Sequence, residues 1–261
     1  MTLRKIIIGL LALSIILNTV SVVLVATVGH PPAIMTPLTT LVMFLFALLH
    51  AGGAYGWRRG AVLLAIVVAT GLAFESVGVA TGVIYGPYHY SDLLGAKFLG
   101  LVPYLIPVAW FMMIYPSLRI ADNLVTRILP RGFWHGLLTA ALAAVAMTAW
   151  DLAMDPMMVA AGHWVWEQPG AYFGVPIQNF WGWWLTTFTA LVLYQVVRRW
   201  LPGKDDPSLP TTWTTTSYAV MGLTTIVTDF LIGLSGPGMV GLFAMLPWTV
   251  LGWMGNRTRL R

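Results

Sequence analysis

The residues of this chain best suited to chemistry are a few carboxylic acids inside long apolar segments. Glu75 is the clearest case, since it lies in the stretch GLAFESVGVATGVIYGPYHYSD, which begins within an apolar run. An ionisable side chain inside a membrane helix is costly and therefore marks a functional site by default. The ordinary alternative is that Glu75 is protonated and only hydrogen-bonds a neighbouring helix. We favour the functional interpretation.

Glu75 shares one face of its predicted helix with three glycines. Gly71, Glu75, Gly78 and Gly82 are spaced at i, i+4, i+7 and i+11, so they form one stripe. The stripe predicts a groove in which the acid is the only bulky side chain. We expect the helix to end at Gly82, where an aromatic segment follows over residues 85–90.

Three more acids lie in other apolar segments, namely Asp151, Asp155 and Asp229. Asp155 follows Asp151 by one helical turn on the same face. Glu75, Asp151 and Asp229 each come 15 or 16 residues after the start of a predicted span, and these spans run in the same direction. At about 1.5 Å per residue, this spacing predicts a similar depth for all three acids. The candidate catalytic residues are therefore Glu75, Asp151, Asp155 and Asp229.

These parts suit the protonation of an alkene. A carboxyl group buried in a low dielectric keeps its proton and can deliver it, and aromatic faces stabilise the resulting cation. Glu75 has no basic residue within its span, so we expect it to act as the general acid. Asp151 and Asp155 should share a proton and orient water, with Asp229 as a further partner. The alternative for the aspartate pair is a bracing role at a helix end near Pro156.

Two loops rich in Tyr, Trp and His should lie beside the acids, over residues 85–90 and 163–172. A single Trp here is more typical of the membrane interface, and His163 alone is more often an ordinary hydrogen-bonded residue. Taken together, the loops and the start of the next apolar segment predict a pocket for a long apolar ligand. The candidate substrate-binding residues are Tyr85, Tyr88, His163, Trp164, Trp166, Asn179 and Trp181.

Long apolar segments must position these residues. Hydrophobic residues make up 58% of the 261 residues and charged residues only 9%, against roughly 25% charged in soluble domains. We therefore predict an all-α, polytopic integral membrane protein with a single transmembrane domain over residues 1–261. The expected spans, each near the ~20 residues that a bilayer requires, are 6–28, 39–56, 60–83, 99–118, 135–155, 179–200, 213–234 and a short eighth ending near Met254.

The basic residues predict the orientation. With eight spans, every Lys and Arg except Lys97 falls on the face that carries both termini. Cytoplasmic loops carry the basic excess, so we predict a protein of the cell membrane with both termini in the cytoplasm. The net charge of +5 is thus a topology signal and gives no support to nucleic-acid binding.

The same composition limits the chemistry. The chain has no cysteine, which excludes disulfides, thiolate catalysis and Cys-ligated metals. Its five histidines lack clustered spacing, and no dinucleotide glycine fingerprint follows a strand. We therefore expect neither a metal nor a cofactor.

Two segments carry a resemblance to a known family. FESVGVATGVIYGPYHY and WDLAMDPMMVAAGHWVWEQPGAYFGVPIQNFWGWW, within the eight-span plan, resemble the membrane carotenoid 1,2-hydratases, which include γ-carotene-type and bisanhydrobacterioruberin-type hydratases. The resemblance covers about residues 35–255 and is densest over residues 71–184. These motifs are long and mix polar with aromatic residues, so they are specific.

The resemblance implies a reaction and a set of residues. The reaction is the cofactor-free addition of water to the terminal isopropylidene double bond of an acyclic carotenoid, giving a tertiary alcohol. The partners would be the carotenoid, water, membrane lipid and other carotenoid-pathway enzymes. The positions that match the family motifs are Glu75, Tyr85, Tyr88, Asp151, Asp155, Trp164, Trp166, Asn179 and Trp181.

Four alternative functions compete with the hydratase interpretation. A carotenoid cyclase would begin with the same protonation but needs a dry pocket. A membrane prenyltransferase is suggested by the spacing of Asp151 and Asp155, yet a second such motif is missing and Lys97 alone offers little positive charge on that face. A di-iron oxygenase would need clustered histidines. A proton-coupled transporter or lipid-binding protein would need ionisable groups in the inner halves of the spans, which are almost free of them.

Overall fold

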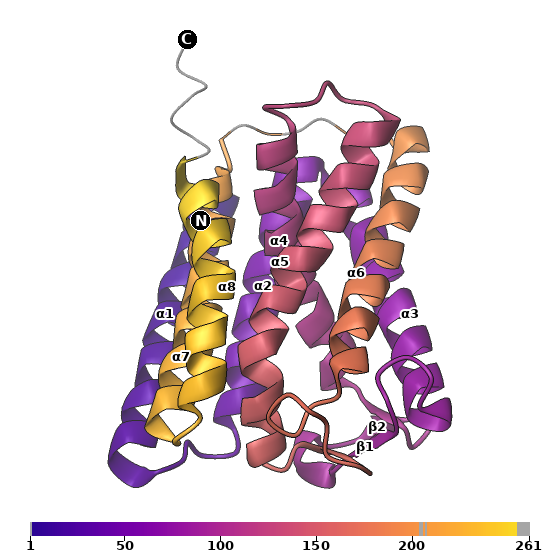
Figure 1. The fold of residues 1–261 in the computed structure, drawn as a ribbon. Coiled ribbons are helices and arrows are strands. Elements are labelled where there is room, and N and C mark those ends of the chain that lie inside the picture. Colours follow the sequence, from indigo (N-terminus) through magenta and orange to yellow (C-terminus); the bar gives the residue numbers. More distant parts are fainter. Residues whose placement is uncertain (1, 204–205, 207, 255–261) are drawn as a thin grey trace.

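The computed structural model of the chain describes residues 2–203, 206 and 208–254, and it is built mainly of long helices (Figure 1). Within that range the α-helices are α1 (Leu3–Val28), α2 (Met35–Tyr55), α3 (Trp57–Thr81), α4 (Leu105–Val125), α5 (Phe133–Ala160), α6 (Ile177–Val197), α7 (Thr211–Leu231) and α8 (Ser235–Met254). They run alternately up and down, so α1 begins and α8 ends at the same end of the bundle (Figure 1). The all-α prediction is confirmed.

The helices fit a membrane protein. In the described part of the chain, α1, α2, α3, α5 and α8 are long and apolar enough to cross a bilayer. The other three, α4, α6 and α7, are 21 residues long each. The integral membrane prediction is confirmed, whereas the number of eight spans stays a prediction.

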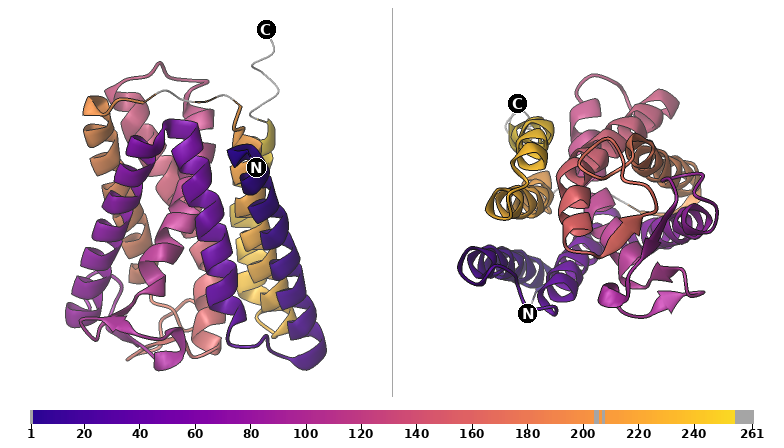
Figure 2. Two further views of the ribbon diagram at one scale, coloured as in Figure 1. Left: turned by 180° about the vertical axis from the view of Figure 1, so that it is seen from behind. Right: turned by 60° about the horizontal axis from the view of Figure 1, so that its bottom comes forward.

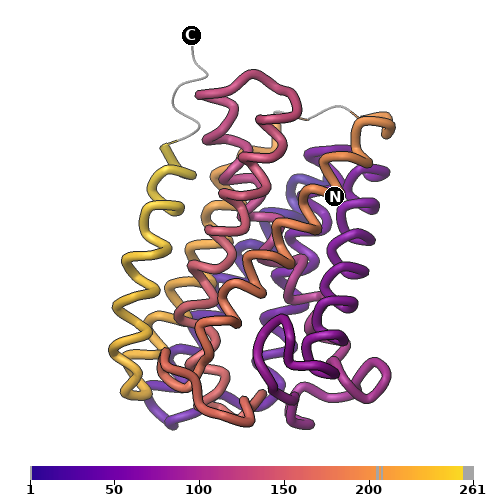
Figure 3. Tube along the Cα trace, turned by 45° about the vertical axis from the view of Figure 1, so that its right-hand side comes forward, coloured from indigo at the N-terminus to yellow at the C-terminus, as the bar shows by residue number. Residues whose placement is uncertain are grey.

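Helix α4 lies at the centre of the bundle. It contacts α2, α3, α5, α7 and α8, and most of its side chains are buried. Helix α6 packs between α3 and α5 (Figure 3). Helices α1, α7 and α8 form one side of the molecule (Figure 2). The acid-bearing helices α3, α5 and α7 therefore surround or adjoin α4.

The fourth helix differs from the predicted fourth span. The span was expected to begin at Leu99, but this segment forms a hairpin of strands β2 (Lys97–Phe98) and β3 (Val102–Pro103), with Leu99 at a φ of 51° in its turn. Helix α4 begins only after the hairpin and continues through Pro116. An apolar composition does not separate a buried hairpin from a helix, which explains the error.

The fifth helix is longer than predicted. It was expected to end at Asp155 but continues through Pro156 to Ala160, so neither Asp151 nor Asp155 caps a helix end there. The third helix ends as predicted, with Gly82 in the left-handed region at a φ of 68°. Such a φ is easy only for glycine, so this residue stops the helix and releases the aromatic segment.

A small sheet covers the end of the bundle near the acids. Strand β1 (Tyr88–Tyr90) pairs antiparallel with β4 (Trp164–Trp166), and Tyr88 lies opposite Trp166. Side chains alternate along a strand, so the outer residues of each strand point inwards and are buried while the central residue is exposed. Two short 3-10 turns, η1 (Asp92–Leu94) and η2 (Arg198–Trp200), complete the fold.

The opposite end of the bundle carries most of the basic residues that are described. Arg58 and Arg59 follow the α2–α3 junction, Arg127 and Arg131 belong to the α4–α5 loop, and η2 carries two more arginines. Lys204 and the three arginines of the tail lie outside the described residues. The grouping at one end agrees with the predicted topology, and the side of the membrane stays a prediction.

Candidate active site

Three acids on different helices occur at equal distances along them. Glu75 in α3, Asp151 in α5 and Asp229 in α7 each lie 18 residues beyond the first residue of their helix. All three are buried, as is Asp155 one turn beyond Asp151. The helices run in the same direction, so these acids occur at a similar level of the bundle, towards the end that the β1–β4 sheet covers.

Glu75 receives hydrogen bonds from three neutral donors. The hydroxyl groups of Tyr88 and Tyr90 both donate to its Oε2, the second at 2.9 Å. The ring N–H of Trp110 donates to Oε1 at 3.0 Å. A carboxyl group with two oxygens has about four acceptor sites, so three are used and one remains for a further donor.

The glycine stripe of α3 does not form an open groove. Aromatic rings occupy it, because Tyr85 lies against Gly78 and Trp110 lies against Gly71. A methyl group at Gly78 would overlap the Tyr85 ring, so the small residues serve to let aromatic side chains approach the helix. The groove prediction is therefore wrong, and the physical reason is that Tyr85 of the following loop and Trp110 of α4 fill the space along the stripe.

Asp151 and Asp155 share one amide group. The side-chain nitrogen of Asn179 donates to Asp151 Oδ2 at 3.2 Å and also to Asp155 Oδ2. Asn179 is itself buried in the first turn of α6, three residues after Pro176. Trp164 of β4 contacts Asp155 as well, and Asp151 Oδ1 has no hydrogen-bond partner among the described residues. The pair thus forms an enclosed dyad held by a donor from a neighbouring helix.

The sheet places neutral tyrosines over the acids. Tyr88 and Tyr90 belong to the same strand and point to the same side, which brings both hydroxyls to Glu75. Burial, and next the nearby Glu75, raises the pKa of Tyr85, Tyr88 and Tyr90 well above the ordinary value. They are therefore neutral hydrogen-bond donors over the physiological range of pH. Trp166 fixes the strand by donating its ring N–H to the Tyr85 carbonyl at 2.9 Å.

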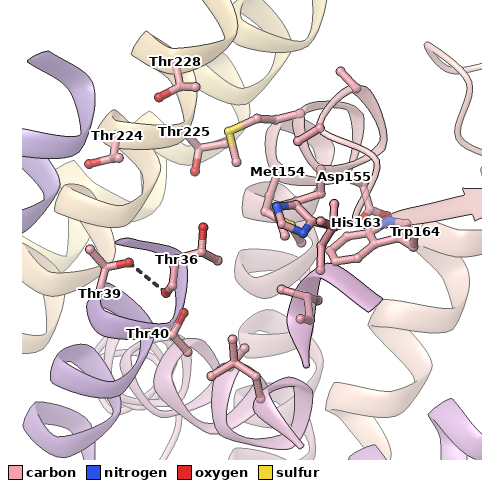
Figure 4. A pocket seen from close by; sticks show the side chains of 18 of the residues that line it. Thr36, Thr39, Thr40, Met154, Asp155, His163, Trp164, Thr224, Thr225 and Thr228 are labelled. Atoms are coloured by element: carbon pink, nitrogen blue, oxygen red, sulfur yellow. Dashed lines mark hydrogen bonds between the residues drawn. The ribbon is translucent and has the colours of Figure 1, made fainter. Parts of the chain in front are cut away.

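A cavity of about 830 Å³ adjoins the acids. Its wall near the acids is aromatic, with Trp110 stacked on Trp183 at 4.3 Å between ring centroids and Trp150 edge-on to Trp183 at 6.1 Å. The residues predicted from sequence that line the cavity are Glu75, Tyr85, Tyr88, Asp155, His163, Trp164, Trp166 and Asn179. Figure 4 shows Asp155, His163 and Trp164 beside one another at this end.

The remaining candidates do not line the cavity. Asp151 lies behind Asp155, which it contacts through Asn179. Asp229 is fully buried, but it faces α8 near Gly238, and neither of its carboxyl oxygens has a hydrogen-bond partner in the described part of the chain. Trp181 is 69% exposed on the outer surface of α6. The structure therefore brings nine of the predicted residues together and leaves Asp229 and Trp181 apart.

The candidate residues omitted four aromatic residues that line the cavity, Tyr90, Trp110, Trp150 and Trp183, although Tyr90 and Trp183 lie in segments that were predicted to wall the pocket. Tyr90 could have been found, because it stands two residues after Tyr88 and so shares its side of a strand. Trp110 and Trp150 gave no signal of their own, since many tryptophans in this chain lie at predicted membrane interfaces. Only the packing of the helices shows that they line the cavity, and that Trp110 reaches Glu75.

The arrangement can move protons. One acid accepts from neutral donors, a second pair shares a single amide, and the wall opposite is aromatic. Among the described residues, no group of three His, Cys, Asp or Glu side chains is placed to hold a metal ion. Independence from metals and cofactors stays a prediction.

Comparisons with known proteins identify the chain's relatives. A family model described as "Carotenoid biosynthesis protein" matches residues 32–247. The bisanhydrobacterioruberin hydratase of Haloarcula japonica is 34% identical over 141 residues, which cover 52% of this chain and 45% of the relative. The chain thus spans less than half the length of that curated relative. No solved structure matches the chain.

Proposed function

This chain belongs to the carotenoid biosynthesis protein family, and from that premise we propose that it is a carotenoid hydratase. The reaction is the addition of water to the terminal isopropylidene double bond of an acyclic carotenoid, by protonation and without a cofactor. The name of the relative supports a hydration reaction. The observation that carries the proposal is the pairing of two acid groups, Glu75 and the Asp151–Asp155 dyad, beside one aromatic cavity.

The dyad supplies the proton. Two carboxylates that share one amide in an enclosed site repel each other, so the pair holds a proton between them. Asp155 lines the cavity and Asp151 does not. Asp155 therefore delivers the proton to the substrate, and Asp151 holds the charge that remains.

Glu75 accepts the proton that water loses. Its three hydrogen bonds all come from neutral donors, and one acceptor site is left for water. From the sequence, Glu75 was expected to donate the proton and the aspartate pair to orient water. These contacts favour the reverse assignment. The sequence showed that Glu75 is isolated from positive charge, but it did not show the three donors that surround its oxygens.

The proton balance closes over one turnover. Asp155 protonates the alkene carbon that carries hydrogen, and the positive charge develops on the carbon that carries two methyl groups. A water molecule bonds to that carbon and passes one proton to Glu75, giving the tertiary alcohol. The proton then returns from Glu75 to the dyad through water, which restores both acids.

The aromatic wall stabilises the cation. Trp110, Trp150 and Trp183 surround the cavity beside Glu75, and the faces of such rings attract positive charge, most strongly for Trp. These ring faces stabilise the positive charge until water adds to it.

The test is expression in a host that accumulates an acyclic carotenoid, followed by mass analysis of the pigment. A hydratase gives a product that is heavier than the substrate by one water for each hydrated end. A cyclase gives a cyclic product of unchanged mass, and an oxygenase adds oxygen without the two hydrogens. A transporter or lipid-binding protein leaves the pigment unchanged. Any of the last three results would contradict the proposal.

We further propose that the chain is a single transmembrane domain of the cell membrane, with both termini cytoplasmic and with lipid and other carotenoid-pathway enzymes as neighbours. Reporter fusions after Arg261 and within residues 162–176 should report opposite sides of the membrane. A result on the same side would contradict this topology.

A further inference from the structure

The cavity continues beyond the acids into a second part that the reaction above does not use. This part lies between α1, α2 and α7, and polar side chains of all three helices line it. We call it the hydroxyl chamber and define it by Asn18, Ser21, Thr36, Thr40, Thr224 and Thr228. Figure 4 shows the threonines of α2 and α7 on opposite sides of one open space, with Asp155 beyond them.

Several hydroxyl groups of the chamber have no protein partner. The Thr39 hydroxyl donates within its own helix to Met35 at 2.8 Å, and the Thr225 hydroxyl accepts from Trp150 and donates to Met221. By contrast, among the described residues the hydroxyls of Thr36, Thr40, Thr224 and Thr228 form no hydrogen bond with the protein. Polar groups that face an enclosed space need partners, and in a roomy polar cavity the partners are water molecules.

The chamber also reaches the surface. The cavity wall includes the turn between α1 and α2, residues 29–33, where His30, Pro32 and Ala33 are exposed. The opposite end of the same cavity is walled by tryptophans around Glu75. One cavity thus has a polar part that opens at a turn and an aromatic part that encloses the acids.

We propose that the hydroxyl chamber holds the water that the reaction consumes and conducts it from the α1–α2 turn to the acids. The proposal rests on the proposed hydration. It separates the two reactants, since water arrives through the chamber while the alkene lies against the aromatic wall. It also gives a role to α1, which lies entirely outside residues 32–247.

The first test measures water access without any turnover. The chain contains no cysteine, so a single introduced cysteine is the only thiol. T40C and T228C should react with a hydrophilic, positively charged methanethiosulfonate, because the thiolate that attacks this reagent and displaces its sulfinate forms readily only in contact with water. The control is V77C, at a residue of α3 that is 48% exposed on the apolar outer surface. We expect both chamber cysteines to react at least about tenfold faster than V77C.

The labelling test can succeed or fail independently of the pigment assay that tests the proposed function. If T40C and T228C are as unreactive as V77C in correctly folded protein, the chamber is dry and the inference fails, whatever the pigment assay shows. Should either variant fail to fold, S21C provides a third position on α1 for the same comparison. Rapid labelling in a protein that does not hydrate carotenoids would leave the water-filled chamber standing and refute the enzyme.

The second test follows the fate of the cation. T40V and T228V together keep the shape of the side chains and remove two hydroxyls. In heavy water, a cation that water does not capture loses a proton and returns as deuterated alkene. We expect the ratio of alcohol to deuterated alkene to fall about tenfold while their sum changes less than twofold. An unchanged ratio, a parallel loss of both products, or a change only in preference for hydroxylated carotenoids would each overturn the inference.

Discussion

The two ends of the bundle both hold buried polar groups, and they pair them in opposite ways. At the basic end the Asp122 carboxylate lies 3.6 Å from the guanidinium of the partly exposed Arg131 and 3.8 Å from the ring of His135. At the other end Glu75 and the aspartate dyad receive hydrogen bonds from Tyr, Trp and Asn. No ion pair to these acids occurs among the described residues.

The kind of partner that each acid has indicates whether the acid serves stability or proton transfer. A carboxylate beside a guanidinium is held by an ion pair, and proton transfer would break that pair. A carboxyl group held only by neutral donors can gain or lose a proton without breaking an ion pair. We therefore assign stability to the basic end and proton transfer to the acidic end.

The largest effect should come from changing the acids. Because general acid catalysis contributes about 10²–10⁴-fold, D155N should lower the rate of hydration by that factor. Without its proton donor the enzyme forms no cation, so substrate recovered from heavy water should carry no deuterium. E75Q should also lose the alcohol, but it should still return deuterated alkene because protonation does not need Glu75. Both products are measured by mass spectrometry after incubation of the purified variants.

The opposite pattern of deuterium exchange would contradict the roles that we assign to Asp155 and Glu75. Deuterium exchange by D155N together with none by E75Q would restore the roles expected from the sequence. Near-normal hydration by both variants would remove the acids from the reaction altogether.

A smaller effect, on stability, is expected from the basic end. D122N removes the negative charge beside the partly exposed Arg131 and should lower the free energy of unfolding by at most about 1 kcal/mol. The activity of the protein that remains folded should be unchanged, because Asp122 lies far along the bundle from the cavity wall. Thermal unfolding and activity per folded molecule are the two measurements. A loss of activity at unchanged stability would show that both ends serve the reaction.

A tryptophan pair sharpens the account of Glu75. W110F removes the ring N–H that donates to Oε1 and should slow hydration about tenfold, the equivalent of one hydrogen bond of ~1.4 kcal/mol. W183F is the matched control, since Trp183 stacks on Trp110 but forms no hydrogen bond among the described residues. Because both rings belong to the aromatic wall, equal losses in both variants would assign the effect to the rings and not to the hydrogen bond of Trp110.

The sequence predicted the acids of the site better than their surroundings. The isolated position of Glu75 and the one-turn spacing of Asp151 and Asp155 are local features, and a local pattern reports them. The donors that hold them, Trp110 and Asn179, come from other helices, and only Asn179 gave a signal. Side chains that meet across helices depend on helix rotation and packing, which no spacing in one segment determines.

The fold shows the same division. Apolar composition predicted a helical membrane protein, and Gly82 predicted the end of α3, since each rests on a local physical cost. The β2–β3 hairpin and the pairing of Tyr88 with Trp166 depend on contacts between distant segments. The threonines of α2 and α7 were not predicted to meet for the same reason.

The smallest predicted effect is a dependence of stability on pH. Burial lowers the pKa of His163 below its ordinary value of 6.5, so the unfolded chain binds this proton more readily than the folded protein. The contribution of His163 is therefore fully present above about pH 6.5 and is lost progressively as the pH falls below it. H163Q should lose less stability than the wild type between about pH 7.5 and 5.5 in thermal unfolding. Equal losses would show that His163 titrates normally.

The most direct test of the central claim is an isotope experiment with the purified protein and an acyclic carotenoid. The reaction is run in heavy water enriched in oxygen-18, under nitrogen and with a metal chelator. The account predicts a tertiary alcohol that carries oxygen-18 and one deuterium on the neighbouring carbon, formed at the same rate as without the chelator. An unchanged substrate free of deuterium, or a product formed only when dioxygen is admitted, would contradict hydration by the buried acids.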